Sequence, residues 1–115
     1  MKKKNIIKSK IDFTRIINNC PYYKNNFFII YFKLNNHKEN RYGITVPKKT
    51  GKAYLRNKIK RQIKNIIDTN EFCIPKSYDY VIIIRKRLIE LNYSDIKNEF
   101  IKLIKMIGEK NEKEK

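Results

Sequence analysis

Residues 48–64 read KKTGKAYLRNKIKRQIK, and this stretch decides more about the fold than any other part of the chain. At 100° per residue, its apolar side chains fall within one arc of a helix that we expect from about Lys52 to Ile67. The arc comprises Leu55, Ile59, Ile63, Ile66 and Ile67. Arg56 also falls inside the arc, but a long side chain in the first turn can still reach solvent. One face of this helix should therefore pack against a core.

The opposite face of the helix is cationic. Residues 48–64 contain eight Lys and Arg side chains and no carboxylate, and the acid-free region extends from Asn40 to Ile67. A solvated helix face usually interleaves Glu with Lys, because opposite charges four residues apart stabilise the helix. A cationic surface without such partners repels itself unless a polyanion neutralises it. The pattern indicates that a nucleic acid binds this face.

The composition sets the broad class of the protein. A chain of 115 residues suffices for one domain with a single core, and 41% hydrophobic residues allow that core to form. The formal net charge of +17 agrees with an anionic partner. No apolar run approaches the roughly 18 residues of a membrane span, and no signal-peptide pattern follows the N-terminal MKKKNIIKSK. We therefore expect a cytoplasmic protein without a membrane partner.

Few side chains are suited to catalysis or metal binding. Cys20 and Cys73 form no C-x-x-C pair and are expected to be reduced thiols. His37 is the only histidine and lies in a polar segment, so neither a metal site nor a histidine-dependent nucleophile is expected. The sequence also lacks a paired-carboxylate constellation. We expect no catalytic residue and no cofactor bound by the protein itself.

The N-terminal half of the sequence predicts one helix and a hairpin. The helix should follow a cap at Ser9, carry Phe13, Ile16 and Ile17 at helical spacing, and end before Pro21. Alternation of apolar residues and β-branched content predict the two hairpin strands at residues 27–34 and 41–46. The third strand is expected in the short segment that leads into residue 47.

The C-terminal half predicts a buried strand and a last helix. The continuous apolar run within residues 80–85 is typical of a strand that is buried on both faces. Ser94 should cap the helix, and Gly108 should end it. Residues 109–115 mix three Glu with three Lys and are expected to be disordered. We predict a single α+β domain over residues 1–108, a sandwich of three helices and about four strands, followed by this charged tail.

A spaced series of residues carries a resemblance to a known family: Lys48-Lys49, Gly51-Lys52-Ala53 and Leu55-Arg56-Asn57-Lys58-Ile59-Lys60-Arg61. This series resembles the signature of the protein subunit of bacterial ribonuclease P, written K-K-x-G-x-A-V-x-R-N-R-x-K-R. Tyr54 stands where Val is usual, and Lys58 replaces the second Arg of R-N-R. Further matches cover most of residues 8–107, at Asp12-Phe13, Phe28 to Tyr31, Arg41 to Gly43 and Asp79 to Arg85.

The resemblance implies an accessory role beside a catalytic RNA. Ribonuclease P removes the 5′ leader from precursor tRNA, and the family implies that the catalytic groups and Mg²⁺ belong to the RNA subunit. It implies contacts to that RNA by Lys48, Lys49, Lys52, Arg56, Asn57, Lys58, Lys60, Arg61 and Lys64. It also implies a left-handed βαβ connection through the basic helix, against the usual right-handed preference.

The resemblance further places the single-stranded leader in a cleft between the first helix and the sheet. The matching cleft positions are Phe13, Ile17 and Tyr31. Exposed aromatic rings can stack on unpaired bases without demanding a particular sequence. Ile17 cannot stack, and without the resemblance Phe13 and Ile17 would be read as core residues, because apolar side chains at helical spacing usually are.

Two other classes of protein share the basic composition. A structural RNA-binding protein of the ribosomal type would use the helix only to hold rRNA, and it would need no aromatic groove for a flexible strand. A DNA-binding protein would read duplex DNA through the same helix. It should then bind duplex DNA and structured RNA with comparable affinity at equal salt, which a competition titration would test.

Overall fold

The computed structural model describes residues 5–7, 10–36 and 38–113. Within these residues the chain forms three α-helices and four strands, which confirms the α+β class. The helices are α1 (Lys10–Asn19), α2 (Ala53–Thr69) and α3 (Tyr93–Lys113). The strands are β1 (Tyr22–Lys24), β2 (Phe28–Leu34), β3 (Arg41–Thr45) and β4 (Tyr78–Ile84). Short 3₁₀ turns, η2 (Lys48–Thr50), η3 (Glu71–Cys73) and η4 (Lys86–Glu90), lie in the connections.

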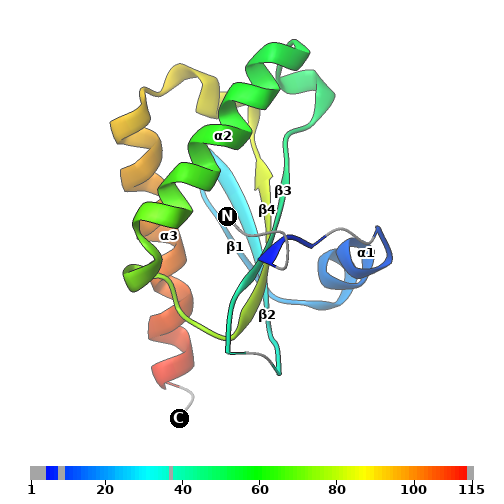
Figure 1. Cartoon of the computed structure of the whole chain (residues 1–115), viewed down its shortest axis with the longest axis vertical. Coiled ribbons are helices and arrows are strands. Elements are labelled where there is room, and N and C mark those ends of the chain that lie inside the picture. The colour runs from blue at the N-terminus through cyan, green and yellow to red at the C-terminus, as the bar shows by residue number, and fades with distance from the viewer. Residues whose placement is uncertain (1–4, 8–9, 37, 114–115) are drawn as a thin grey trace.

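The strands form one mixed sheet in the order β1-β2-β4-β3. The hairpin expected between residues 27–34 and 41–46 is therefore wrong, because β4 lies between β2 and β3 and pairs with both. The pairs β1–β2 and β2–β4 are antiparallel, whereas β3 and β4 are parallel neighbours. The chain passes from β3 to β4 through α2, which confirms the expected βαβ unit (Figure 1). The left hand that the resemblance implies for this connection stays a prediction.

The main core lies between one face of the sheet and the helices α2 and α3. Alternate residues of β2, such as Phe28 and Ile30, point into it, and α2 contributes the four isoleucines of its predicted apolar arc. Phe100 of α3 meets Phe28 edge to face, with ring centroids 5.6 Å apart. This packing explains why the apolar arc of α2 tolerates no charge beyond its first turn.

A second, smaller core lies on the opposite face, under α1 (Figure 1). Ile16 of α1 and Val81 of β4 are buried there, together with Ile7 from the segment before the helix. The backbone N–H of Ile7 donates to the carbonyl of Tyr42 over 2.9 Å, so this segment extends the sheet beyond β3. The helices therefore cover both faces, as the sandwich prediction requires.

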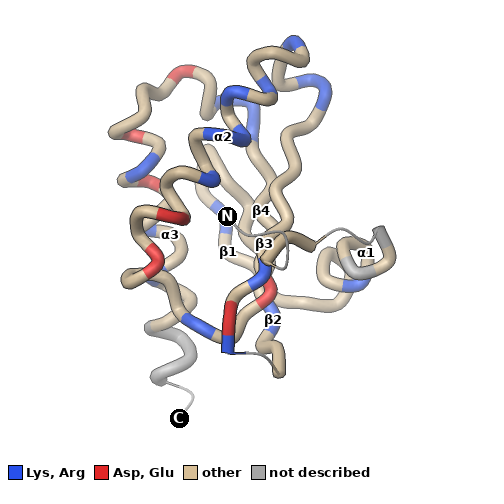
Figure 2. Tube along the Cα trace, viewed as in Figure 1, with Lys and Arg blue, Asp and Glu red and all other residues tan. Residues whose placement is uncertain are grey.

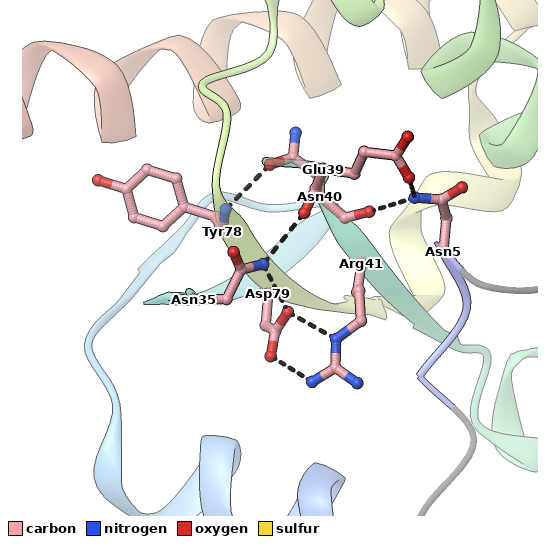
Figure 3. A network of polar contacts seen from close by, with 7 residues as sticks. All are labelled: Asn5, Asn35, Glu39, Asn40, Arg41, Tyr78 and Asp79. Carbon is pink, nitrogen blue, oxygen red and sulfur yellow. Dashed lines mark hydrogen bonds and ion pairs between the residues drawn. The ribbon is translucent and has the colours of Figure 1, made fainter. Parts of the chain in front are cut away.

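A polar network ties the end of the sheet to the loop between β2 and β3 (Figure 3). Asp79 of β4 is buried and accepts two hydrogen bonds from Arg41, from Nε over 2.9 Å and from Nη2 over 2.6 Å. Asn35 donates a third hydrogen bond to the same carboxylate. Arg41 and Asp79 are also Cα partners in the parallel β3–β4 ladder, so the pair fixes the register of these strands.

Two tyrosines stack inside the main core. The rings of Tyr42 and Tyr80 lie 5.5 Å apart with an interplanar angle of 16°. Burial raises the pKa of Tyr42 to about 12, although a hydrogen bond from Asn40 opposes the shift. Burial also raises the pKa of Tyr80 well above its ordinary value. Both side chains therefore stay neutral over the physiological range.

A second correction to the expected fold concerns the additional strand. It precedes β2, as β1, instead of lying in the segment before Pro47, where β3 ends at Thr45 and η2 follows from Lys48. Asn25 makes this possible, because its side-chain oxygen accepts the backbone N–H groups of Phe27 and Phe28, both over 2.8 Å, and so turns the chain into a hairpin.

The last helix also differs from its prediction at both ends. Its cap is Asn92, whose side-chain oxygen accepts the N–H of Asp95 over 2.9 Å, and not Ser94. The helix does not stop at Gly108 but continues to Lys113, so residues 109–113 are helical where disorder was expected. A Cβ at Gly108 would lie 3.0 Å from Pro75 Cγ, so the glycine serves close packing instead of termination.

Candidate nucleic-acid interface

The approach to α2 depends on one glycine. Gly51 has a φ of 158°, and a Cβ on it would lie 2.8 Å from Leu55 Cδ2, so a side chain at this position would be strained. The turn leads into Lys52, the N-terminal flanking residue of α2, which makes no side-chain capping bond. The first turn of α2 contains no acidic residue. The positive end of the helix dipole therefore adds to a positive surface.

The residues predicted to bind RNA lie within residues 48–64, on η2, at Lys52 and on α2. We call these nine residues the basic surface: Lys48, Lys49, Lys52, Arg56, Asn57, Lys58, Lys60, Arg61 and Lys64. Figure 2 shows that the Lys and Arg positions of α2 and the preceding loop are free of interspersed Asp and Glu. Arg56, Lys60 and Lys64 are half-buried, and the other six are exposed. Their assignment to RNA binding stays a prediction.

The cations of the basic surface have no acidic partners among the described residues. Within the described residues, the ion pairs Arg41–Asp79 and Lys102–Glu99 both lie outside the basic surface. Arg56 is a special case, because its Nε is shielded from solvent and has no hydrogen-bond partner within the described residues. The sequence placed this residue inside the apolar arc, and its half-buried stem agrees with that reading.

The predicted leader-binding residues do not share one environment. Phe13 and Tyr31 are half-buried and both pack against the smaller core, whereas Ile17 is 37% exposed. The ring of Phe13 lies against Gly43 of β3, and Tyr31 touches the ring of Tyr22 on β1. The structure brings Phe13 and Tyr31 to the same face of the sheet, but it leaves Ile17 outside their cluster.

A hollow of about 140 Å³ links the two predicted surfaces at the edge of β3. Phe13 and Ile44 contribute apolar walls, and Lys60 and Lys64 of α2 line the other side. The hollow thus brings two lysines of the basic surface close to an aromatic residue of the predicted leader site. A nucleic-acid strand that crosses this edge would meet both.

From the sequence, Tyr22 is expected to be a half-buried rim residue, with a base-stacking platform as the alternative. It is 49% exposed, and its ring centroid lies 5.1 Å from that of Tyr31. The available signal was the alternation of Tyr22, Tyr23 and Lys24, in which the middle residue packs inward and the outer two are exposed. A run of three residues is too short for periodicity to identify a strand.

The described residues contain neither a metal-binding cluster nor a membrane-spanning helix. No three His, Cys, Asp or Glu side chains in this part of the chain are grouped so that they could hold a metal ion. Among the same residues, no helix has both the length and the apolar character needed to span a membrane.

Comparison with known proteins gives the family. The family model described as Ribonuclease P matches residues 1–108. The chain belongs to the ribonuclease P protein family. Among ribonuclease P protein components, that of Mycoplasma capricolum is 44% identical over 108 residues, covering 93% of this chain and 99% of its own length. That of Streptococcus agalactiae is 37% identical over 108 residues, covering 94% and 98%.

Solved ribonuclease P proteins have the same fold. The protein from Thermotoga maritima superposes with a TM-score of 0.82 at 33% identity, covering 87% of this chain and 94% of its own. The Staphylococcus aureus protein gives the same TM-score at 32% identity, covering 90% and 94%. Both the family and the four-stranded α+β fold expected from the resemblance are therefore confirmed.

Proposed function

We propose that this chain binds the catalytic RNA of ribonuclease P through its basic surface and the 5′ leader of precursor tRNA through the α1 face of the sheet. In this role it supports the endonucleolytic removal of the leader during tRNA 5′ maturation. The chain acts as an accessory subunit, and the catalytic groups lie in the RNA. Membership of the ribonuclease P protein family supports this assignment.

The observation that carries the proposal is the two-sided character of α2. Ile59, Ile63, Ile66 and Ile67 are buried and hold the helix rigidly against the sheet. The other side presents cations that no carboxylate of the described residues neutralises. A fixed row of positive charges binds a phosphate backbone without the entropic cost of ordering a flexible segment.

The two kinds of cation on this surface contribute differently. The guanidinium of Arg61 is exposed and can grip a phosphate through two parallel hydrogen bonds. Lys58, where the family usually has Arg, offers a single point charge instead. Mg²⁺ bound by the RNA supplies the chemistry of phosphodiester cleavage, and the protein's cations reduce the repulsion between the RNA strands that must meet.

Reconstitution tests the proposal. The purified protein is mixed with the host's catalytic RNA and a precursor tRNA at low Mg²⁺, and 5′ maturation is followed with and without protein. We expect faithful cleavage that depends on the protein, and no cleavage by the RNA-free protein alone. A protein that binds the RNA without changing cleavage would instead be a structural RNA-binding protein, and specific cleavage by the protein alone would overturn the accessory role.

A further inference from the structure

We propose that Tyr22 and Tyr31 form a platform on which unpaired bases of the precursor tRNA leader stack, with Lys24 and Lys33 as partners for the flanking phosphates. The inference rests on the proposed function, because it takes the leader as the ligand. It adds a binding site on β1, a strand that contributes nothing to the leader positions implied by the family resemblance.

The first observation is the register of the β1–β2 hairpin. Tyr22 and Tyr31 are Cα partners in this antiparallel pair, so their side chains leave the same face of the sheet. Their ring centroids lie 5.1 Å apart with an interplanar angle of 45°. The two rings therefore form one contiguous aromatic surface that spans two strands.

The alternation along both strands determines which face carries this surface. Tyr23 and Phe32 point into the main core, where their rings stack 5.5 Å apart at 15°. Their neighbours in sequence must point to the opposite face, toward the side covered by α1. Lys24 follows Tyr22 on that face, and Lys33 follows Tyr31. Both lysines are exposed, so each end of the tyrosine pair has an ammonium group.

The degree of burial suits a stacking platform. Tyr31 is half-buried against the smaller core and cannot move freely, whereas Tyr22 is 49% exposed and lies on the edge strand of the sheet. Aromatic rings that alternate with cations bind single-stranded nucleic acid, because any base can stack and the cations follow the backbone. The fitting ligand is thus an unpaired stretch of RNA with little sequence preference.

The position in the sheet connects the platform to the predicted leader surface. Tyr22, Tyr31, Val81 and Gly43 are successive partners in one row across all four strands. Phe13 packs on Gly43 at one end of the row, and Tyr22 ends it at the other edge. The buried Val81 separates the two aromatic ends, so Tyr22 extends the surface on the Tyr31 side.

The test uses the complete ribonucleoprotein, assembled from the protein and the catalytic RNA, with precursor tRNAs whose leaders differ in length and with mature tRNA. Tyr22→Ala is expected to weaken binding of long-leader precursors by about 5- to 30-fold, the lower part of the range for one lost stacking contact. As the leader is shortened, the difference in affinity between Tyr22→Ala and the wild type should disappear once the leader no longer reaches Tyr22. Mature tRNA should bind both proteins equally. Tyr22→Phe keeps the ring and should bind like the wild type.

Three further variants separate stacking from charge and from general surface effects. Lys24→Ala and Lys33→Ala should each reduce the salt slope of precursor binding by about one. Phe72→Ala removes an aromatic side chain that is 81% exposed outside the β1–β2 pair, and it should leave binding unchanged. Thermal melting of each variant verifies that the fold is retained.

The outcomes distinguish failure of the Tyr22–Tyr31 platform from failure of the proposed leader contact. Unchanged precursor affinity of Tyr22→Ala at every leader length overturns the platform while the proposed leader contact stands, provided that the wild type prefers precursor over mature tRNA. Equal losses for precursor and mature tRNA also overturn it. A wild type that binds both tRNAs equally overturns the leader contact itself, and the platform with it.

Discussion

Phe13 and Gly43 lie in direct contact across the interface between α1 and the sheet: a Cβ added to Gly43 would stand 2.3 Å from Cζ of Phe13 and 2.8 Å from Cε2. The glycine therefore lets the ring rest on the backbone of β3. The two residues are far apart in sequence, yet together they set the height at which α1 lies above the sheet.

Gly43→Ala should consequently push Phe13 and α1 away from the sheet. We expect a loss of about 1 to 3 kcal/mol in the free energy of unfolding, as for other overpacked sites, measured by urea denaturation. The same substitution in a Phe13→Ala background should cost clearly less, because the clashing ring is gone. An equal loss of stability in both backgrounds would show that the contact with Phe13 does not restrict the size of the side chain at position 43.

Arg61→Ala should weaken binding to the catalytic RNA by roughly 1.5 to 3 kcal/mol, the range for a charged hydrogen-bonded contact. The salt slope of binding should fall by about one. Arg61 is exposed, so the protein's stability should hardly change. Lys102→Ala is the matched control, because Lys102 is an exposed cation on α3. Equal RNA affinities of the Arg61→Ala and Lys102→Ala proteins would show that α2 does not bind the catalytic RNA.

Arg56→Ala should give a mixed result, unlike Arg61→Ala. Its shielded Nε and half-buried stem mean that truncation also removes packing. We expect the same loss of RNA affinity together with a lower midpoint of urea denaturation. A variant that binds RNA normally but unfolds at lower urea would identify Arg56 as a structural residue.

Tyr31→Ala should reduce the affinity of the ribonucleoprotein for precursor tRNA by about 1 to 3 kcal/mol and leave mature tRNA unaffected. The difference between the two substrates cancels any general damage from the loss of a half-buried ring. Direct titrations with the two RNAs measure it. If assembly with the catalytic RNA fails instead, Tyr31 belongs to the core alone.

Asp79→Asn should be destabilising, by about 1.5 to 3 kcal/mol, because the buried carboxylate loses its charge-assisted hydrogen bonds to Arg41, whose side chain is partly exposed. The pair of Lys102 and Glu99 offers the comparison, because its N–O distance is 4.0 Å, Lys102 is exposed, and surface pairs contribute about 0 to 1 kcal/mol. Urea denaturation of Asp79→Asn and Glu99→Gln measures both. Similar small effects would mean that the β3–β4 register does not depend on the Arg41–Asp79 pair.

Tyr42 makes stability depend on alkaline pH. Burial raises its pKa to about 12 from an ordinary value of 10.0, so between these values the unfolded chain releases a proton that the folded chain keeps. The stabilisation is fully present below pH 10 and is lost as pH rises toward 12. Tyr42→Phe should flatten this part of the stability curve, as measured by denaturation at a series of pH values. Identical slopes for both proteins would contradict the role of burial.

The sequence predicted those features that depend on local pattern. The isoleucine spacing located the buried face of α2, and apolar runs located β2 and β4 to within two residues. β1 was missed because three residues carry no period, and its strand conformation depends on pairing with β2 and on the turn at Asn25. The cap at Asn92 was misplaced because two capping residue types lie close together before the helix.

The candidate site divides in the same way. The exposure of Arg61 and Lys58 follows from helical angles, so the basic surface could be outlined from sequence alone. The neighbours of Phe13 and Tyr31 could not be predicted from sequence alone. Gly43 lies beside Phe13, and Tyr22 lies beside Tyr31, because of the order of the strands in the sheet. Strand order is set by tertiary packing, and the hydrophobic periodicity of a single strand does not show which strands are its neighbours.

The parallel pairing of β3 with β4 also has a kinetic consequence. Arg41 and Asp79 are 38 positions apart, and their strands can pair only after the whole connection between them has closed into a loop. That loop contains the acid-free cationic stretch, whose self-repulsion opposes compaction of the unfolded chain. Counter-ions relieve this repulsion. The rate at which the chain reaches its native topology is therefore tied to the anions around it during folding.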